Sequence, residues 1–182
     1  MDGESGFTKL GEEVLAECYS FNVVAARFTG PDGQTFERDV VHHRGAVAVV
    51  PMHEDGSVTL VRQFRASLDG DLLELPAGVR DVDGEPDQRT AERELAEEAG
   101  LAASSMEPLI TIHNAPGMSD ERISVFVARE LTAVPDDRQG VEEMAMTVER
   151  IPMQDALAMI DDGRITDTKT IVGILLLARR SP

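Results

Sequence analysis

The sequence predicts a protein of the mixed α/β or α+β class, in which helices cover a mixed β-sheet. Three observations predict this class. Short apolar runs separated by turns that contain Gly or Pro fill the first half of the chain, which is typical of strands and hairpins. The second half contains three helical stretches among further strand candidates. Strands and helices do not alternate strictly, and this favours a mixed sheet over a wholly parallel one.

Strands are expected first along the chain. Five segments before residue 76 are predicted as strands: 23–28, 35–41, 46–52, 58–64 and 72–75. Gly30-Pro31-Asp32-Gly33 separates the first two, and proline presets one φ there while glycine tolerates a positive φ. Glu54-Asp55-Gly56 separates the next two, so we expect a second hairpin at that point.

The segment 87–99 predicts a helix, because it contains no Gly, Pro or Val. Gly100 follows it at the place of a left-handed C-terminal cap. Three further strands and two closing helices are expected after this point: strands at 109–113, 123–128 and 144–148, and helices at 154–161 and 168–179.

Composition and charge exclude several classes of protein. The 182 residues suffice for a core without disulfides, and 42% of them are apolar and 28% charged, as in soluble globular domains. Lys and Arg number 17 against 34 Asp and Glu, so a net charge of −17 opposes binding to nucleic acids and anionic membranes. The single Cys18, the lack of a long apolar run and an N-terminus without the order of a secretion signal predict a soluble cytoplasmic protein.

Three carboxylates of the predicted helix carry the strongest functional signal. Glu94, Glu97 and Glu98 are spaced i, i+3, i+4 and therefore fall on one strip of the helix. Like charges at this spacing repel one another, and a divalent cation such as Mg²⁺ or Mn²⁺ would reverse that repulsion. The alternative for these residues is a solvent-facing acidic helix in an acidic protein.

The surrounding pattern resembles the Nudix box, G-x5-E-x7-R-E-U-x-E-E-x-G-U with U apolar. The matching residues are Gly78, Glu85, Arg93-Glu94-Leu95, Glu97-Glu98 and Gly100-Leu101. Every element from Glu85 onward matches, but six residues rather than five separate Gly78 from Glu85. The resemblance implies a Nudix-type α/β/α sandwich with a mixed β-sheet (45–182) and a small N-terminal β-sheet lobe (1–44). It also implies hydrolysis of a nucleoside diphosphate linked to another group.

The resemblance also implies roles for individual residues. The metal ligands would be Glu94, Glu97, Glu98, Glu142 and the carbonyl of Ala77, with Mg²⁺ as the ion and Mn²⁺ as the alternative. Arg93 would orient a neighbouring glutamate, and Glu97 and Glu142 would join it in catalysis, with Glu142 as the base and Glu143 in reserve. Glu85 would stabilise the junction of loop and helix.

Features outside the box resemble the ADP-ribose pyrophosphatase branch of the family. Leu73-Glu74-Leu75-Pro76-Ala77-Gly78 matches the entry to the box in that branch, and Pro116 lies fifteen residues after Leu101. The resemblance implies that ADP-ribose is cleaved to AMP and ribose 5-phosphate. The substrate-binding residues would be Arg38, Arg65, Val79, Ala115, Pro116, Gly117 and Glu121. His42 and Arg44 depart from the branch, which usually has a glutamate and an apolar residue there.

Several alternatives remain open at this stage. The substrate could be another nucleoside diphosphate sugar, a dinucleotide or an oxidised nucleoside triphosphate, and a non-catalytic nucleotide sensor is a further reading. Adenine could stack on Tyr19, Phe21 or Phe28, although core packing also explains each of these side chains. The branch commonly forms homodimers through an N-terminal sheet, so we expect a homodimer here, with a swapped sheet as the open question.

Overall fold

The computed structural model describes residues 6–138 and 140–180, which form two compact units. The first unit consists of the N-terminal part of the chain as far as Gly45, joined by the later segment His113–Arg122. The second unit consists of Ala46–Ile112 and the chain from Ile123 onward. No helix in the described part of the chain is long and apolar enough to cross a membrane.

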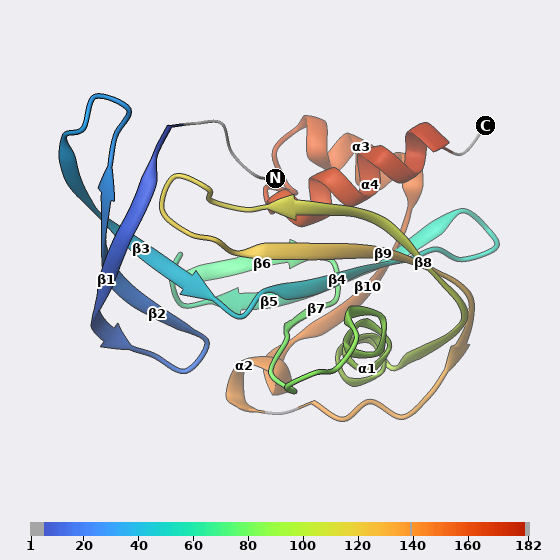
Figure 1. The fold of residues 1–182 in the computed structure, drawn as a ribbon. Helices are drawn as coiled ribbons and strands as arrows, with labels where there is room; N and C mark the ends of the chain where they lie inside the picture. The colour runs from blue at the N-terminus through green and yellow to red at the C-terminus, as the bar shows by residue number, and fades with distance from the viewer. Residues whose placement is uncertain (1–5, 139, 181–182) are drawn as a thin grey trace. The chain divides into compact units, whose positions relative to one another are not determined.

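The first unit is built on a three-stranded antiparallel meander in the order β1-β2-β3, drawn in blue in Figure 1. Its strands are β1 (Thr8–Glu17), β2 (Phe21–Thr29) and β3 (Thr35–His43). The predicted hairpin of β2 and β3 is confirmed, and Phe28 pairs with Phe36 across it. The rings of these two residues stack at 5.6 Å between centroids. The segment 113–122 joins β3 through a parallel bridge between Val41 and Ser119.

The second unit contains two sheets and four helices, counted over its described residues. A mixed sheet has the order β7-β4-β9-β8, and an antiparallel sheet has the order β10-β5-β6. The strands are β4 (Ala46–Pro51), β5 (Ser57–Arg65), β6 (Gly70–Glu74), β7 (Ala77–Val79), β8 (Leu101–His113), β9 (Arg122–Ala133) and β10 (Thr147–Pro152). The helices are α1 (Asp87–Ala99), α2 (Gly140–Ala145), α3 (Met153–Asp161) and α4 (Thr168–Arg180).

Strand β4 lies at the centre of the second unit and is covered on both faces. Val47 and Val49 pack with α1 and with one face of β9, whereas Ala48 and Val50 pack with α3, α4 and the second sheet. Figure 1 shows the same layering, with α1 on one side of β4 and α3 and α4 on the other. A strand buried on both faces reads as a continuous apolar run, as this one does. The predicted α/β/α sandwich with a mixed sheet is confirmed.

The pairing of β4 with β5 was predicted wrongly. The chain does turn between them, since the His53 N–H donates to the Ser57 carbonyl at 2.9 Å. The two strands then diverge into different sheets, and an isolated bridge between Met52 and Val58 is the pairing that the described residues show. The reason is that β4 takes β9 as a parallel partner and β7 as an antiparallel one, which leaves both its edges occupied.

Other differences concern where elements begin. The strand expected at 144–148 begins at Thr147, because residues 140–145 form α2, and Met144 lies in that helix. Strands β1 and β7 were not predicted. Strand β1 is exposed along nearly its whole length and so lacks a buried stripe, and β7 is three residues long. Both are defined by their partners, β2 and β4, rather than by their own pattern.

Candidate active site

Helix α1 is fixed in the second unit by its apolar face. Ala91 and Leu95 are fully buried in the cluster that contains Val47 and Val49 of β4. The helix ends at Gly100, whose φ of 63° and ψ of 35° are left-handed, as predicted. The register of the helix on the sheet therefore decides where its glutamates lie.

Two glutamates flank that buried face and are buried with it. Glu94 is 8% exposed and Glu98 is 4% exposed, although Asp and Glu are seldom buried without a partner. Glu97, between them, is half-buried. The acidic strip predicted from the spacing is therefore divided into an interior pair and a residue nearer the surface.

Strand β7 packs directly against these two carboxylates. The Ala77 N–H donates to Glu98 Oε2 at 2.8 Å. Gly78 lies against Glu94 so closely that a Cβ built on it would be 2.1 Å from Glu94 Cδ and 2.3 Å from each carboxylate oxygen. Only glycine permits this approach of backbone to carboxylate. The Ala77-Gly78 step and the helix are thus in direct contact.

Arg93 forms ion pairs with carboxylates of the helix and of the loop before it. Its Nη1 lies 2.8 Å from Glu94 Oε1 and 3.0 Å from Glu97 Oε2, and its Nη2 lies 2.9 Å from Asp81 Oδ1. Glu85 is 3.7 Å from the same Nη2 and accepts a hydrogen bond from Thr90 Oγ1 at 2.8 Å. The guanidinium therefore links the loop to the helix and restrains Glu94 and Glu97.

Burial changes the acidity of the interior pair. Removal from water raises the pKa of Glu94 to about 7, against the opposing effect of Arg93. Removal from water likewise raises the pKa of Glu98 to about 8, although the Ala77 N–H and the charge of Arg65 act in the other direction. The charge of Glu143 raises the pKa of both groups. Such buried carboxyl groups favour either a proton or a cation at neutral pH.

We expect the metal-free protein to lose stability as the pH rises from about 4.5 to about 8. Over this range the unfolded chain has ionised Glu94 and Glu98 while the folded chain retains their protons, so the unfolded state gains the advantage. In EDTA, Glu98→Gln should melt near the wild-type temperature at pH 5 and several degrees above it at pH 8.

Glu92→Gln is the control for this melting experiment, because Glu92 lies on the same helix but pairs with Arg89 at 2.8 Å. Its melting temperature should follow that of the wild type across the range. A difference between Glu98→Gln and the wild type that does not grow with pH would contradict the assignment of a raised pKa to Glu98.

The donor set fits a hard divalent cation. Carboxylate and carbonyl oxygens are the ligands that Mg²⁺ prefers, and a dication would offset the cost of ionising the two buried carboxyl groups. Among residues 6–138 and 140–180, no three Asp, Glu, His or Cys side chains converge as ready-made metal ligands. Glu94 and Glu97 instead share Arg93. The residues that could hold the cation are Glu94, Glu97, Glu98 and the Ala77 carbonyl.

The two glutamates predicted in the late loop differ in their burial. Both lie in the first turn of α2, where Glu142 is exposed and Glu143 is half-buried. Burial is the main cause of the raised pKa of Glu94 and of Glu98, and the charge of Glu143 adds a smaller contribution in the same direction. The choice of Glu142 as the base, with Glu143 in reserve, stays a prediction.

Arg65 lies in the same unit, held by a carboxylate that the sequence did not single out as a partner. Its Nε and Nη2 each lie 2.7 Å from one oxygen of Glu74, in a two-pronged ion pair. Lys169, from the first turn of α4, also pairs with Glu74. Sequence reasoning missed Lys169, because a single lysine near the start of a helix carries no distinctive signal. Val79, a predicted substrate residue, lies at the end of β7 and accepts the Asp81 N–H at 2.9 Å.

The first unit contains the other predicted substrate residues. Arg38, Pro116 and Gly117 line one cavity of about 590 Å³, whose remaining walls include the rings of Phe28 and Phe36. The guanidinium of Arg38 lies over the Phe36 ring, 4.8 Å from its centroid. Residues almost eighty positions apart in the sequence are thus brought together in a largely apolar pocket, which Asp39 and Asp120 also line.

Hydrogen bonds hold the segment that carries Pro116 in shape. The carbonyl of Ala115 accepts the Met118 and Ser119 N–H groups, and Glu121 Oε2 accepts from Asn114 Nδ2 at 3.1 Å. His42 lies between Glu12 and Asp120, at 2.9 and 2.6 Å, and these two carboxylates raise its pKa. The histidine that departs from the family pattern therefore ties β1 and the segment 113–122 to β3.

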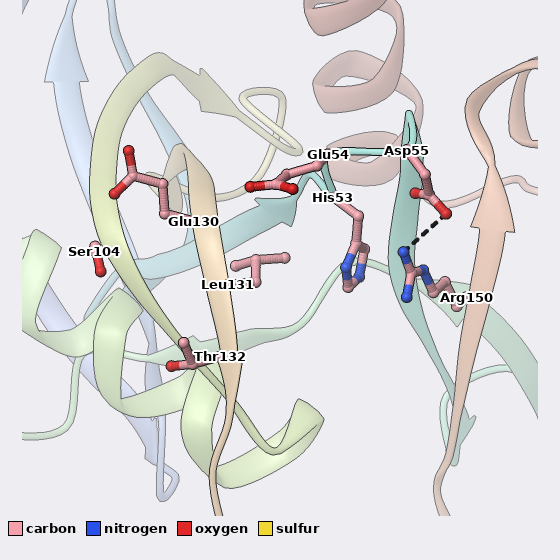
Figure 2. Close-up of a pocket in the computed structure, with 8 residues that line it drawn as sticks. All are labelled: His53, Glu54, Asp55, Ser104, Glu130, Leu131, Thr132 and Arg150. Carbon is pink, nitrogen blue, oxygen red and sulfur yellow. Dashed lines mark ion pairs between the residues drawn. The ribbon is translucent and has the colours of Figure 1, made fainter.

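A further cavity of the second unit, of about 510 Å³, contains none of the predicted site residues. Figure 2 shows its lining, with His53, Glu54 and Asp55 from the turn after β4, Glu130 and Thr132 from β9, and the ion pair of Asp55 with Arg150 at 2.9 Å. Ser104 and Leu131 complete the wall. None of the glutamates of α1 lines this cavity.

Known proteins are similar to this chain in sequence and in fold. An ADP-ribose pyrophosphatase of Mycobacterium tuberculosis is 38% identical over 172 residues, which cover 94% of this chain and 83% of that protein. An ADP-ribose pyrophosphatase of Bacillus subtilis is 35% identical over 147 residues, covering 81% and 79%. The crystal structure of an ADP compounds hydrolase superposes with a TM-score of 0.81 at 22% identity, covering 95% and 92%.

Residues 42–169 match the NUDIX domain, and this stretch contains the whole motif from Gly78 to Leu101. The match spans more than two thirds of the chain, and the interior glutamate pair, Arg93 and the Ala77-Gly78 step all lie within it. The chain therefore belongs to the NUDIX family.

Proposed function

We propose that the protein hydrolyses the pyrophosphate bond of ADP-ribose, or of a closely related nucleoside diphosphate sugar, with Mg²⁺ as its metal and with AMP and ribose 5-phosphate as products. The observation that carries this proposal is the buried pair Glu94 and Glu98 against the backbone of β7. The relatives named for ADP-ribose cleavage support the choice of substrate. Mn²⁺ is the alternative ion.

Different residues of the second unit are proposed to bind the metal and to position its ligands. Mg²⁺, when bound, neutralises diphosphate charge and lowers the pKa of a water molecule. Glu94, Glu97, Glu98 and the Ala77 carbonyl would hold it, and Arg93 would keep Glu94 and Glu97 in place. The protein's net charge of −17 gives an anionic substrate no other general attraction, so the cation and the arginines must supply it.

A proton must leave the attacking water. We assign this step to Glu143, with Glu142 as the alternative, because Glu143 is the more buried of the two and its charge contributes to the raised pKa of Glu94 and of Glu98. The water oxygen forms a bond to one phosphorus, and the bond from that phosphorus to the bridging oxygen breaks. Arg65, in the same unit, is proposed to bind the phosphate oxygens, to which a planar guanidinium group is well matched.

A substrate panel tests this proposal. The wild-type protein is assayed with ADP-ribose, ADP-glucose and a nucleoside triphosphate, each in MgCl₂ and in EDTA, and AMP is quantified by chromatography. We expect AMP from ADP-ribose in MgCl₂, less from ADP-glucose, and none in EDTA. Preference for the triphosphate would move the substrate to another class, and nucleotide binding without turnover would point to a sensor.

The N-terminal sheet favours a homodimer. Leu10, Val14 and Leu15 of β1 are each more than half exposed, which leaves an unusual amount of apolar side chain on one strand. A second copy of the chain would cover it. Light scattering should give twice the chain mass of 19.8 kDa, and replacing Leu10 and Val14 by Ser should shift the protein toward monomer. A monomeric wild type would contradict this part of the proposal.

A further inference from the structure

A buried charged network lies next to the glutamate pair and includes residues from three elements. Glu74, at the end of β6, is 1% exposed and accepts both prongs of the Arg65 guanidinium. Lys169, which is 8% exposed, pairs with Glu74 and lies 3.0 Å from Asp167 Oδ1. Burial alone would raise the pKa of Glu74, but Arg65 and Lys169 outweigh it and hold that pKa below its usual value.

The network contains two positive and two negative side chains. Lys169 is shared between Glu74 and Asp167, and Asp167 also accepts from Thr170 Oγ1 at 2.6 Å and from the Thr170 N–H at 3.0 Å. With Lys169 present, the four side chains together carry no net charge. Without Lys169, the remaining Arg65, Glu74 and Asp167 would carry a net charge of −1, and Arg65 would attract an anion less.

The same segment connects this network to the glutamate pair. The Leu75 N–H donates to Thr170 Oγ1 at 2.8 Å, so the first turn of α4 holds the end of β6. Two residues later, the Ala77 N–H donates to Glu98. The charge of Arg65 also lowers the pKa of Glu98. Arg65 therefore lies where its charge reaches the metal-binding carboxylates.

One part of the Arg65 guanidinium remains available. Nε and Nη2 are committed to Glu74, whereas Nη1 makes no hydrogen bond to any residue that the structure describes. The side chain of Arg65 is about one third exposed, while that of Glu74 is almost completely buried. A guanidinium that is hydrogen-bonded along one edge and has a donor left on the other is well suited to bind a phosphate oxygen in a fixed direction.

We propose that Glu74 and Lys169 are positioning residues for the substrate diphosphate: Glu74 fixes the plane of the Arg65 guanidinium, and Lys169 offsets the negative charge of Glu74 and Asp167, which would otherwise repel the diphosphate from Arg65. The inference rests on the proposed function and extends it to α4, which the motif does not include. The competing explanation is a network that only stabilises the fold.

A double-mutant cycle separates the two explanations. Arg65→Lys, Glu74→Gln and the double variant are compared by KM and kcat for ADP-ribose and by melting temperature. If Glu74 acts through Arg65, each single change raises KM about tenfold with kcat within about threefold, and the double variant is no worse than Arg65→Lys alone. Effects on KM that multiply in the double variant would overturn the proposal.

Lys169→Met gives a second cycle with Arg65→Lys and should behave in the same way. Arg62→Lys and Glu149→Gln form the matched control, since Arg62 lies on the same strand and pairs with Glu149 at 2.7 Å outside the network. The control changes should leave KM within about twofold. If neither Glu74→Gln nor Lys169→Met folds, the network is a stability device and the proposal fails.

The cycle remains informative if the proposed substrate is wrong. Should the wild type cleave a different nucleoside diphosphate, the same variants are measured on that compound. Should it cleave none, the dissociation constant of ADP in MgCl₂ is measured by calorimetry and takes the place of KM. Failure of the function would then appear in the wild type, and failure of the inference would appear in the coupling between variants.

Discussion

Glu98→Gln is expected to lower kcat for ADP-ribose by a factor of about one hundred or more, with KM changed by less than about threefold. The substitution preserves the shape of the side chain and an oxygen that can accept the Ala77 N–H. It removes the negative charge that would hold the cation, and loss of such electrostatic stabilisation in the transition state typically has this magnitude. Steady-state kinetics in saturating MgCl₂ measure both constants.

The control for this change is Glu92→Gln on the outer part of the same helix. Glu92 pairs with Arg89 and Gln88, so its loss should leave kcat within about twofold of the wild type. Glu98→Gln should also keep or raise the melting temperature of the metal-free protein at pH 8, which excludes misfolding as the cause. Turnover by Glu98→Gln close to that of the wild type would remove Glu98 from the proposed metal site.

Gly78→Ala should also reduce kcat by about one hundredfold, although it neither removes nor adds a charged side chain. The new methyl would overlap the Glu94 carboxylate, with 2.1 Å to Cδ, and the carboxylate must move away. Because the displaced atoms are the free end of a flexible side chain, the fold should accommodate the change, and the melting temperature should shift by only a few degrees. Kinetics and thermal unfolding together distinguish a displaced ligand from a damaged core.

Gly70→Ala is the matched control for a methyl added to a glycine of the same unit. The nearest atom to a Cβ there is the Leu68 carbonyl oxygen at 3.8 Å, an ordinary contact. Its kcat should be unchanged. If Gly78→Ala retained full activity, the Glu94 carboxylate would not need its observed position, and the assignment of Glu94 as a ligand would be wrong.

Local signals allowed α1 to be predicted at its observed limits. Its composition, the glycine that ends it and the spacing of Ala91 and Leu95 all act within one or two turns of helix. The pairing of strands depends on partners far along the chain, and so the tight turn after β4 suggested a hairpin that β9 and β7 prevent. Strand existence could be predicted better than strand partnership.

In the candidate site, too, local features could be predicted from the sequence, and features that depend on distant partners could not. The spacing of Glu94 and Glu98 predicts that they share one side of the helix, because i and i+4 are neighbours. It does not predict that they are buried and that Glu97 is not, since this depends on how α1 lies on β4. The partnership of Glu74 with Lys169 spans ninety-five positions and has no periodicity or motif, so only the folded chain reveals it.

The two-sided burial of β4 has an evolutionary consequence. Its odd-numbered valines face the helix that carries the glutamates, and its even-numbered residues face the helix that carries Lys169. One residue inserted into or deleted from β4 would exchange these two faces. The packing of α1, which carries the glutamates, and the packing of α4, which carries Lys169, would both be disrupted. We therefore expect relatives that acquire new substrates to vary the length of their connecting loops and to keep the length of this strand constant.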